Sequence, residues 1–178
     1  MSCTGACPDP LPEAFDRYAG YMTFAGAPSP TASANWISGL AITVSASAPL
    51  ALRVSENYTL SLPSGVGNDT IAMLTADTQW GALRGIETFS QLFVWAGRGV
   101  PVSYCTSSAG LQVVDFPKYP WRGLLIDSSR HFLPLSAILV TLDAMAFNKL
   151  NTLHCECADQ PPAFFARANP PLHKLQGT

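Results

Sequence analysis

One stretch of this chain, residues 119–159, limits the available folds more than any other. Within it, residues 123–127 form an apolar run that ends in an acid, which is typical of a strand buried on both faces. Apolar residues then recur at helical spacing over 135–145, and the predicted helix closes at Asn148. Residues 151–154 begin a second strand. This order predicts one βαβ unit with parallel strands.

The loop after the first of these strands reads Ser128-Ser129-Arg130-His131. In β/α barrels, the carboxyl ends of the strands carry the functional residues. The guanidinium of Arg130 is a rigid fork of donors that suits two neighbouring hydroxyl groups of a sugar ring. Arg130 is therefore the strongest candidate for ligand binding, and a structural ion pair with Asp127 is the alternative.

The upstream residues predict a small α+β layer, an antiparallel sheet with helices on one face. Apolar spacing indicates helices over 13–22 and 80–95, and Gly97 should end the second. Strands are expected at 40–44, 58–62, 71–75, 100–104 and 111–114, of which the last two form a hairpin. The two prolines of residues 115–120 mark the domain joint.

Composition excludes several classes of protein. Of the 178 residues, 48% are hydrophobic and 12% are charged, so the chain can form a core and is not a disordered tail. A formal net charge of -2, without a basic run, argues against nucleic acid as a partner. No apolar run reaches the ~20 residues of a transmembrane helix. Residues 1–7 lack the basic start and apolar stretch of a signal peptide.

Several long motifs are similar to one known family. WRGLLIDSSRHFLPLSAILVTLDAMAFNKLN, residues 121–151, resembles the opening of the catalytic barrel of β-N-acetylhexosaminidases of glycoside hydrolase family 20, of the eukaryotic lysosomal type. SENYTL (55–60) and WGALRGIETFSQL (80–92) resemble the small domain that precedes this barrel, and PEAFDRY (12–18) resembles its N-terminal helix.

The resemblance implies an N-terminal α+β domain over residues 1–117. Residues 118–178 would hold the first βα unit of a truncated (β/α)8 TIM barrel, with a divergent tail from residue 161. The implied reaction of the intact protein is hydrolysis of terminal non-reducing N-acetylhexosamine, in which the 2-acetamido oxygen of the substrate attacks the anomeric carbon. The catalytic Asp-Glu pair of the family has no counterpart here, so we expect this chain to be inactive alone. The alternative is a non-catalytic truncated isoform or gene fragment that acts only as a folding or interaction domain.

The resemblance also assigns roles to single residues. Arg130 would hold the 3- and 4-hydroxyls of the terminal sugar. Asp159 aligns with the first acid of an Asp-Asp pair and would accept a hydroxyl hydrogen bond, although it could equally be a solvated loop acid. The doubt arises because the His-Trp-His of the family reads His154-Cys155-Glu156 here. For both His131 and His154, a packed core residue is the favoured interpretation.

Neither a metal nor a cofactor is predicted. His154, Cys155, Glu156 and Cys157 include zinc-ligand types, but alternate side chains of a strand point to opposite faces. Cys7 matches a position that forms a disulfide in the lysosomal relatives. Its expected partner near residues 47–49 is missing, which predicts a free thiol or another pairing such as one with Cys105.

The remaining expectations concern modification, partners and location. Asn57 and Asn68 begin Asn-X-Thr sequences and are candidate N-glycosylation acceptors. The resemblance implies glycans or glycoconjugates that end in N-acetylglucosamine or N-acetylgalactosamine as partners, and it allows a homodimer of the full-length protein. It also implies a lysosomal, vacuolar or secreted location.

Overall fold

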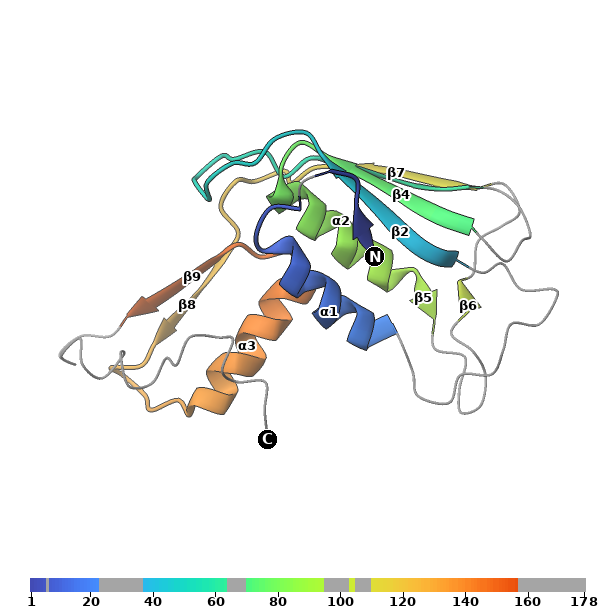
Figure 1. Ribbon diagram of the computed structural model, residues 1–178. Coiled ribbons are helices and arrows are strands. Elements are labelled where there is room, and N and C mark those ends of the chain that lie inside the picture. The colour runs from blue at the N-terminus through green and yellow to red at the C-terminus, as the bar shows by residue number, and fades with distance from the viewer. Residues whose placement is uncertain (6, 23–36, 64–69, 95–102, 105–109, 157–178) are drawn as a thin grey trace. The chain divides into compact units, whose positions relative to one another are not determined.

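The computed structural model describes residues 1–5, 7–22, 37–63, 70–94, 103–104 and 110–156. It divides the chain into two compact units, Met1–Pro120 and Trp121–Thr178. In Figure 1, the elements of the first unit run from blue to yellow, and those of the second run from yellow to red.

The first unit is built on a five-stranded mixed sheet. β1 (Ser2–Cys3) and β2 (Ile37–Val44) are parallel, and β2 is also parallel to β4 (Thr70–Ala76). β3 (Tyr58–Leu62) is antiparallel to both β4 and β7 (Leu111–Asp115), which gives the order β1-β2-β4-β3-β7. The expected antiparallel sheet was therefore wrong. β2, β3 and β4 alternate in direction along the chain, and β4 lies between β2 and β3 in the sheet. It is therefore antiparallel to β3 and parallel to β2.

Two helices cover one face of this sheet, α1 (Leu11–Met22) and α2 (Gln79–Gln91) (Figure 1). The predicted helix over 13–22 is confirmed, with two further residues at its start. Alternation along β3 and β4 sends every second side chain toward the helices. The fully buried large side chains are contributed by helices and strands alike: Leu11, Leu40, Ile42, Leu60, Leu74 and Ile86.

The end of α2 and the strands after it differ from the prediction. α2 stops at Gln91, and Leu92 caps it with a backbone N–H that donates to the carbonyls of Phe89 and Ser90. The next residues form β5 (Phe93–Val94), which pairs with β6 (Ser103–Tyr104). β7 pairs with β3 instead of β6, so the expected hairpin was wrong. Alternation predicts that a segment is a strand, but it does not identify the partner strand. Gly97 lies outside the described residues.

Close approach of α2 to the sheet depends on small residues. A Cβ atom at Gly81 would collide with the backbone carbonyl of Asn57, and one at Gly85 would collide with the side chain of Leu74. At the start of the helix, Thr78 accepts hydrogen bonds from the backbone N–H groups of Trp80 and Gly81. The sequence of α2 is therefore fitted to a tight helix–sheet contact.

Two buried carboxylates tie the elements of the first unit together. Glu56 accepts from Nε of Arg84 at 2.6 Å, and Glu87 accepts from the hydroxyl of Tyr18 at 2.6 Å. Burial, followed by the hydrogen bond to Glu87, raises the pKa of the Tyr18 hydroxyl above its ordinary value. Such partners offset the cost of burying a charge.

The N-terminal cysteines pair locally. Cys3 and Cys7 form a disulfide with a Cα–Cα distance of 5.5 Å. Of the two alternatives, the free thiol was wrong and another pairing is present, with Cys3 as the partner in place of Cys105. Cys3 is the last residue of β1 and lies only four residues before Cys7 in the sequence.

The second unit is the predicted βαβ motif. β8 (Gly123–Asp127) and β9 (Thr152–Glu156) are parallel, and α3 (Leu135–Phe147) connects them. A Cβ at Gly123 would lie 2.9 Å from the carbonyl oxygen of Thr152, so this position favours glycine. β8 was expected to be buried on both faces, yet Leu125 is 62% exposed. In the described residues β8 pairs only with β9, and two strands with one helix cannot cover both faces.

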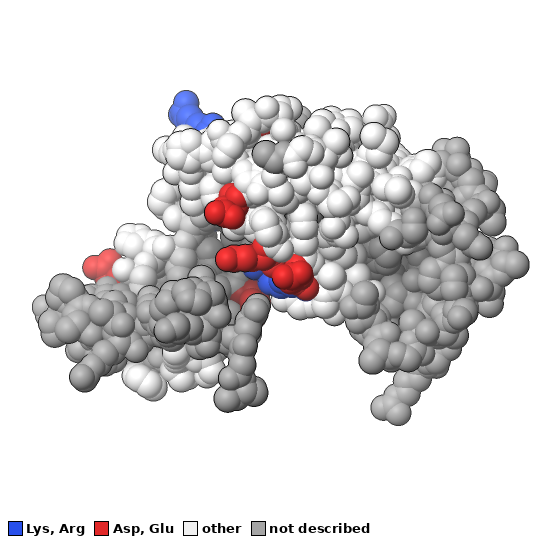
Figure 2. All heavy atoms as spheres, viewed as in Figure 1, with Lys and Arg blue, Asp and Glu red and all other residues white. Residues whose placement is uncertain are grey.

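Charged side chains are sparse over the described surface that Figure 2 shows, in keeping with a sequence that is 12% charged. Among the described helices, none is long and apolar enough to cross a membrane.

Candidate functional site

Asp127 organises the carboxyl end of β8. Its Oδ1 accepts hydrogen bonds from the backbone N–H groups of Ser129 at 3.0 Å and Arg130 at 3.1 Å. A side-chain oxygen that accepts from residues two and three positions ahead fixes a tight turn. The same turn is tied to the neighbouring strand, because the backbone N–H of Ser128 donates to the carbonyl of Glu156 at 3.1 Å. The loop after β8 is thus held at both strands.

Arg130 lies on this turn with its side chain 83% exposed. Its Nε is 3.6 Å from Oδ2 of Asp127, an ion pair whose carboxylate is 28% exposed. The ion pair with Asp127, which was the alternative interpretation of Arg130, is therefore present. A long, exposed pair of this kind contributes little to stability. The turn leaves most of the guanidinium accessible to a ligand at the strand end.

The carboxyl end of β9 adds a second pair of polar side chains. Nε2 of His154 lies 3.6 Å from Oε2 of Glu156, and both side chains are about half exposed. His131 is exposed as well. The expectation that His131 and His154 are packed core residues was therefore wrong. His154 and Glu156 share a face because they are two residues apart on one strand.

Some predicted residues lie outside the described part of the chain, namely Asp159, Asn68, Cys105 and Cys157. Among the described residues, no group of three or more His, Cys, Asp or Glu side chains could hold a metal ion.

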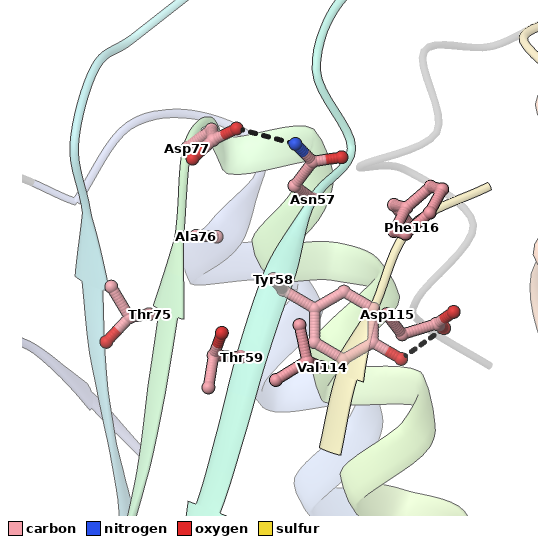
Figure 3. A pocket seen from close by; sticks show the side chains of 9 residues that line it. All are labelled: Asn57, Tyr58, Thr59, Thr75, Ala76, Asp77, Val114, Asp115 and Phe116. Atoms are coloured by element: carbon pink, nitrogen blue, oxygen red, sulfur yellow. Dashed lines mark hydrogen bonds between the residues drawn. The ribbon is translucent and has the colours of Figure 1, made fainter.

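Asn57 lies in the first unit, directly before β3. Its Nδ2 donates to Oδ2 of Asp77 at 3.0 Å (Figure 3). The same oxygen accepts from the Ser55 hydroxyl at 2.6 Å. Asn57 is exposed, so its amide is accessible as the predicted glycosylation acceptor. It also lines a hollow of about 190 Å³ on the sheet face opposite the helices.

Sequence reasoning missed two features of these regions. It treated Asp127 only as an ion-pair partner or strand-end acid, whereas this carboxylate builds the turn that carries Arg130. An Asp two and three residues before the N–H groups it binds is a recognisable signal. The hollow beside Asn57 combines residues of β3, β4 and β7, and no local pattern could have revealed it.

Two family profiles match the chain. Residues 7–92 match "beta-acetyl hexosaminidase like", and residues 119–164 match "Glycosyl hydrolase family 20, catalytic domain". The first match lies within the mixed-sheet unit. The second covers the whole described βαβ motif, including the turn with Arg130.

Curated relatives agree with these profiles. The chain is 41% identical to beta-hexosaminidase subunit alpha of Bos taurus over 157 residues, which are 84% of this chain and 28% of the relative. It is 46% identical to beta-hexosaminidase subunit beta of Homo sapiens over 105 residues, 58% of this chain and 17% of the relative. The chain thus spans less than a third of these relatives.

Solved structures share its fold. A chitobiase of Flavobacterium johnsoniae matches with a TM-score of 0.62 and 26% identity, over 86% of this chain and 23% of that one. The N-acetyl-beta-hexosaminidase of Streptomyces plicatus in complex with Thio-NAglucal matches with a TM-score of 0.57 and 22% identity, over 86% and 29%. These solved structures show a shared fold, and the two profiles and the curated relatives show that the chain is similar to β-hexosaminidases of glycosyl hydrolase family 20.

Proposed function

We propose that this chain is the N-terminal part of a β-N-acetylhexosaminidase, which removes terminal non-reducing N-acetylhexosamine residues from glycans or glycoconjugates. The observation that carries the proposal is the turn after β8. There, Asp127 binds two backbone N–H groups and presents an accessible Arg130 at the carboxyl end of a parallel strand. The family 20 catalytic-domain profile covers this turn, and in β/α barrels this strand end carries the functional residues.

In the proposed site, Arg130 holds the 3- and 4-hydroxyls of the terminal sugar. Two donors of one rigid guanidinium bind two oxygens of one ring, so they fix both its position and its orientation. The Asp127 turn limits the freedom of the Arg130 backbone, which reduces the entropy lost on binding. Asp159 is proposed as a further hydroxyl acceptor. The carboxyl groups that assist attack by the 2-acetamido oxygen would come from later strands of the barrel.

The finer expectations belong to the same proposal. Residues 1–117 would form the α+β domain, and residues 118–178 would begin the TIM barrel, with the joint in the proline-containing segment 115–120. The resemblance to hexosaminidases of the eukaryotic lysosomal type implies a lysosomal, vacuolar or secreted location, which belongs to the same proposal. Homodimer formation and glycosylation of Asn57 and Asn68 stay predictions.

A chimaera tests the activity. Residues 1–153 would be joined to the bovine alpha subunit from the position that follows the equivalent of Leu153, which restores the remaining barrel. We expect this protein to hydrolyse a chromogenic β-N-acetylglucosaminide. We expect no turnover by the 178-residue polypeptide, whose sequence contains no Asp-Glu dipeptide. A folded chimaera with the circular dichroism of a family member but no turnover would overturn the proposal and favour a non-catalytic folding or interaction domain.

A further inference from the structure

The hollow beside Asn57 lies on the sheet face that α1 and α2 leave open (Figure 3). β4, β3 and β7 lie side by side beneath it, and the residues that face the hollow form two rows across these strands. β3 pairs Thr59 with Thr75 on one side and with Val114 on the other. Continued by one step, the same registers set Asn57 between Asp77 and Phe116. Tyr58, Ala76 and Asp115 alternate with these residues, so their side chains point away and their backbone closes the floor.

One wall of the hollow is apolar. Val114 is 70% exposed and Phe116 is 67% exposed. An aromatic ring carries negative charge on its face and attracts the weakly positive C–H groups of a ligand. An exposed ring beside a hollow is therefore a surface on which the apolar face of another ring can lie.

The opposite wall and the floor supply polar groups with free capacity. Both side-chain hydrogen bonds of Asp77 end on Oδ2, and its Oδ1 accepts none from the described residues. The hydroxyls of Thr59 and Thr75 likewise make no hydrogen bond with the residues that the structure describes. Asn57 is held in place by Asp77, so its amide is a fixed group at the rim. These groups can exchange hydrogen bonds with hydroxyls.

Charge and size restrict the ligand further. The lining includes two acids, Asp77 and Asp115, and no Lys or Arg, which excludes a phosphate or another anion. Asp115 accepts from the Tyr58 hydroxyl at 2.7 Å, so it is already engaged. The hollow has a volume of about 190 Å³, below the roughly 300 Å³ at which pockets for drug-sized ligands begin. Its size therefore limits the ligand to one ring.

We propose that this hollow is a second, non-catalytic carbohydrate-binding site, which holds one neutral pyranose ring of a glycan. The C–H face of the sugar lies on Phe116 and Val114, and its hydroxyls bind Oδ1 of Asp77 and the Thr59 and Thr75 hydroxyls. The site belongs to the mixed-sheet unit and requires no hydrolysis. Its binding therefore stands or fails independently of the proposed hexosaminidase activity.

The test uses the ¹⁵N-labelled 178-residue chain made in bacteria, so that Asn57 carries no sugar. N-acetylglucosamine and N,N′-diacetylchitobiose are titrated while amide shifts are followed, with glycerol as the polyol control. We expect saturable shifts at Asn57, Thr59 and Thr75, with half-saturation on the order of 1–10 mM, as a single shallow ring contact implies. Glycerol should cause none.

Two variants and a matched control assign the shifts to the hollow. Phe116→Ala should raise the half-saturating concentration at least about fivefold, because the ring face is lost. Thr59→Val keeps the shape and removes one hydroxyl, and it should weaken binding by about threefold or more. Met73→Ala removes an equally exposed apolar side chain (60%) outside the lining and should bind as the parent does.

The proposal is overturned if no saturable shift appears in the hollow at 50 mM sugar, a concentration about fivefold above the range expected for this contact. It is also overturned if the Phe116 and Thr59 variants, with parent-like amide spectra, bind as tightly as the parent. Shifts confined to residues 128–132 would locate sugar binding at the strand end of the second unit alone, which likewise contradicts a site at the hollow.

Discussion

The two units of this chain differ in how far they bury their apolar side chains. In the mixed-sheet unit, apolar side chains alternate along the strands, and those on one face pack against two helices. Leu60 is one of them and is 0% exposed. In the βαβ unit, apolar residues occur on both faces of β8 and around α3, and only Met145 of α3 is buried. A strand that is apolar on both faces is suited to a barrel, where neighbouring strands and helices cover it. The first unit therefore contains its own core, whereas the second requires further elements to cover its apolar side chains.

Limited proteolysis should show the largest difference between the units. A unit with a closed core opens rarely, whereas one with exposed apolar strands opens often. We expect the 178-residue polypeptide to leave a resistant core that ends within residues 115–120, with cleavage after this segment at least about tenfold faster. Mass spectrometry of the products over time checks this. A resistant product that runs through Glu156 would contradict the contrast.

Matched leucine truncations should separate the cores by free energy. Leu60→Ala removes a buried side chain of β3, and we expect it to lower the free energy of unfolding by about 2–5 kcal/mol. Leu125→Ala acts on a strand residue that is 62% exposed and should cost less than about 1 kcal/mol. Urea denaturation of both variants gives the values. Equal costs would show that β8 is as well covered as β3.

Two glycine substitutions sharpen the account of the first unit. Gly81→Ala places a Cβ against the Asn57 carbonyl, and because backbone cannot move aside easily, we expect a loss of about 2 kcal/mol or more. Gly20→Ala in α1 meets no atom within 4 Å and should stabilise by about 0.5–1 kcal/mol through helix propensity. Thermal melts of both proteins report the signs. A tolerated Gly81→Ala would mean that α2 does not approach β3 so closely.

Local patterns predicted much of the fold. The spacing of apolar residues predicted α3, and alternation at Tyr58, Leu60 and Leu62 predicted β3, because both signals lie within one element. Strand pairing was not predictable in the same way. β4 lies between β2 and β3, and β7 pairs with β3, and both arrangements depend on contacts far apart in the sequence. For that reason, the sheet direction and the expected hairpin were wrong.

The candidate site was predictable only in part. The type of residue at Arg130 and its place after a strand followed from the sequence, whereas the turn that Asp127 builds required coordinates. The exposure of His154 and its pairing with Glu156 also depend on how few elements cover β9. The hollow at Asn57 needed the registers of three strands at once.

The most direct test of the central claim is Arg130→Lys in the chimaera with a complete barrel. Lys offers one mobile ammonium and cannot bind two hydroxyls as the guanidinium fork does, so the sugar should bind loosely and sit out of line for acetamido attack. The account predicts a fall in kcat/KM of at least ~100-fold, or about 2.7 kcal/mol, with an almost unchanged melting temperature. Near-normal kinetics would contradict a substrate role for Arg130, and a large fall in melting temperature together with the lost activity would assign it to the ion pair with Asp127.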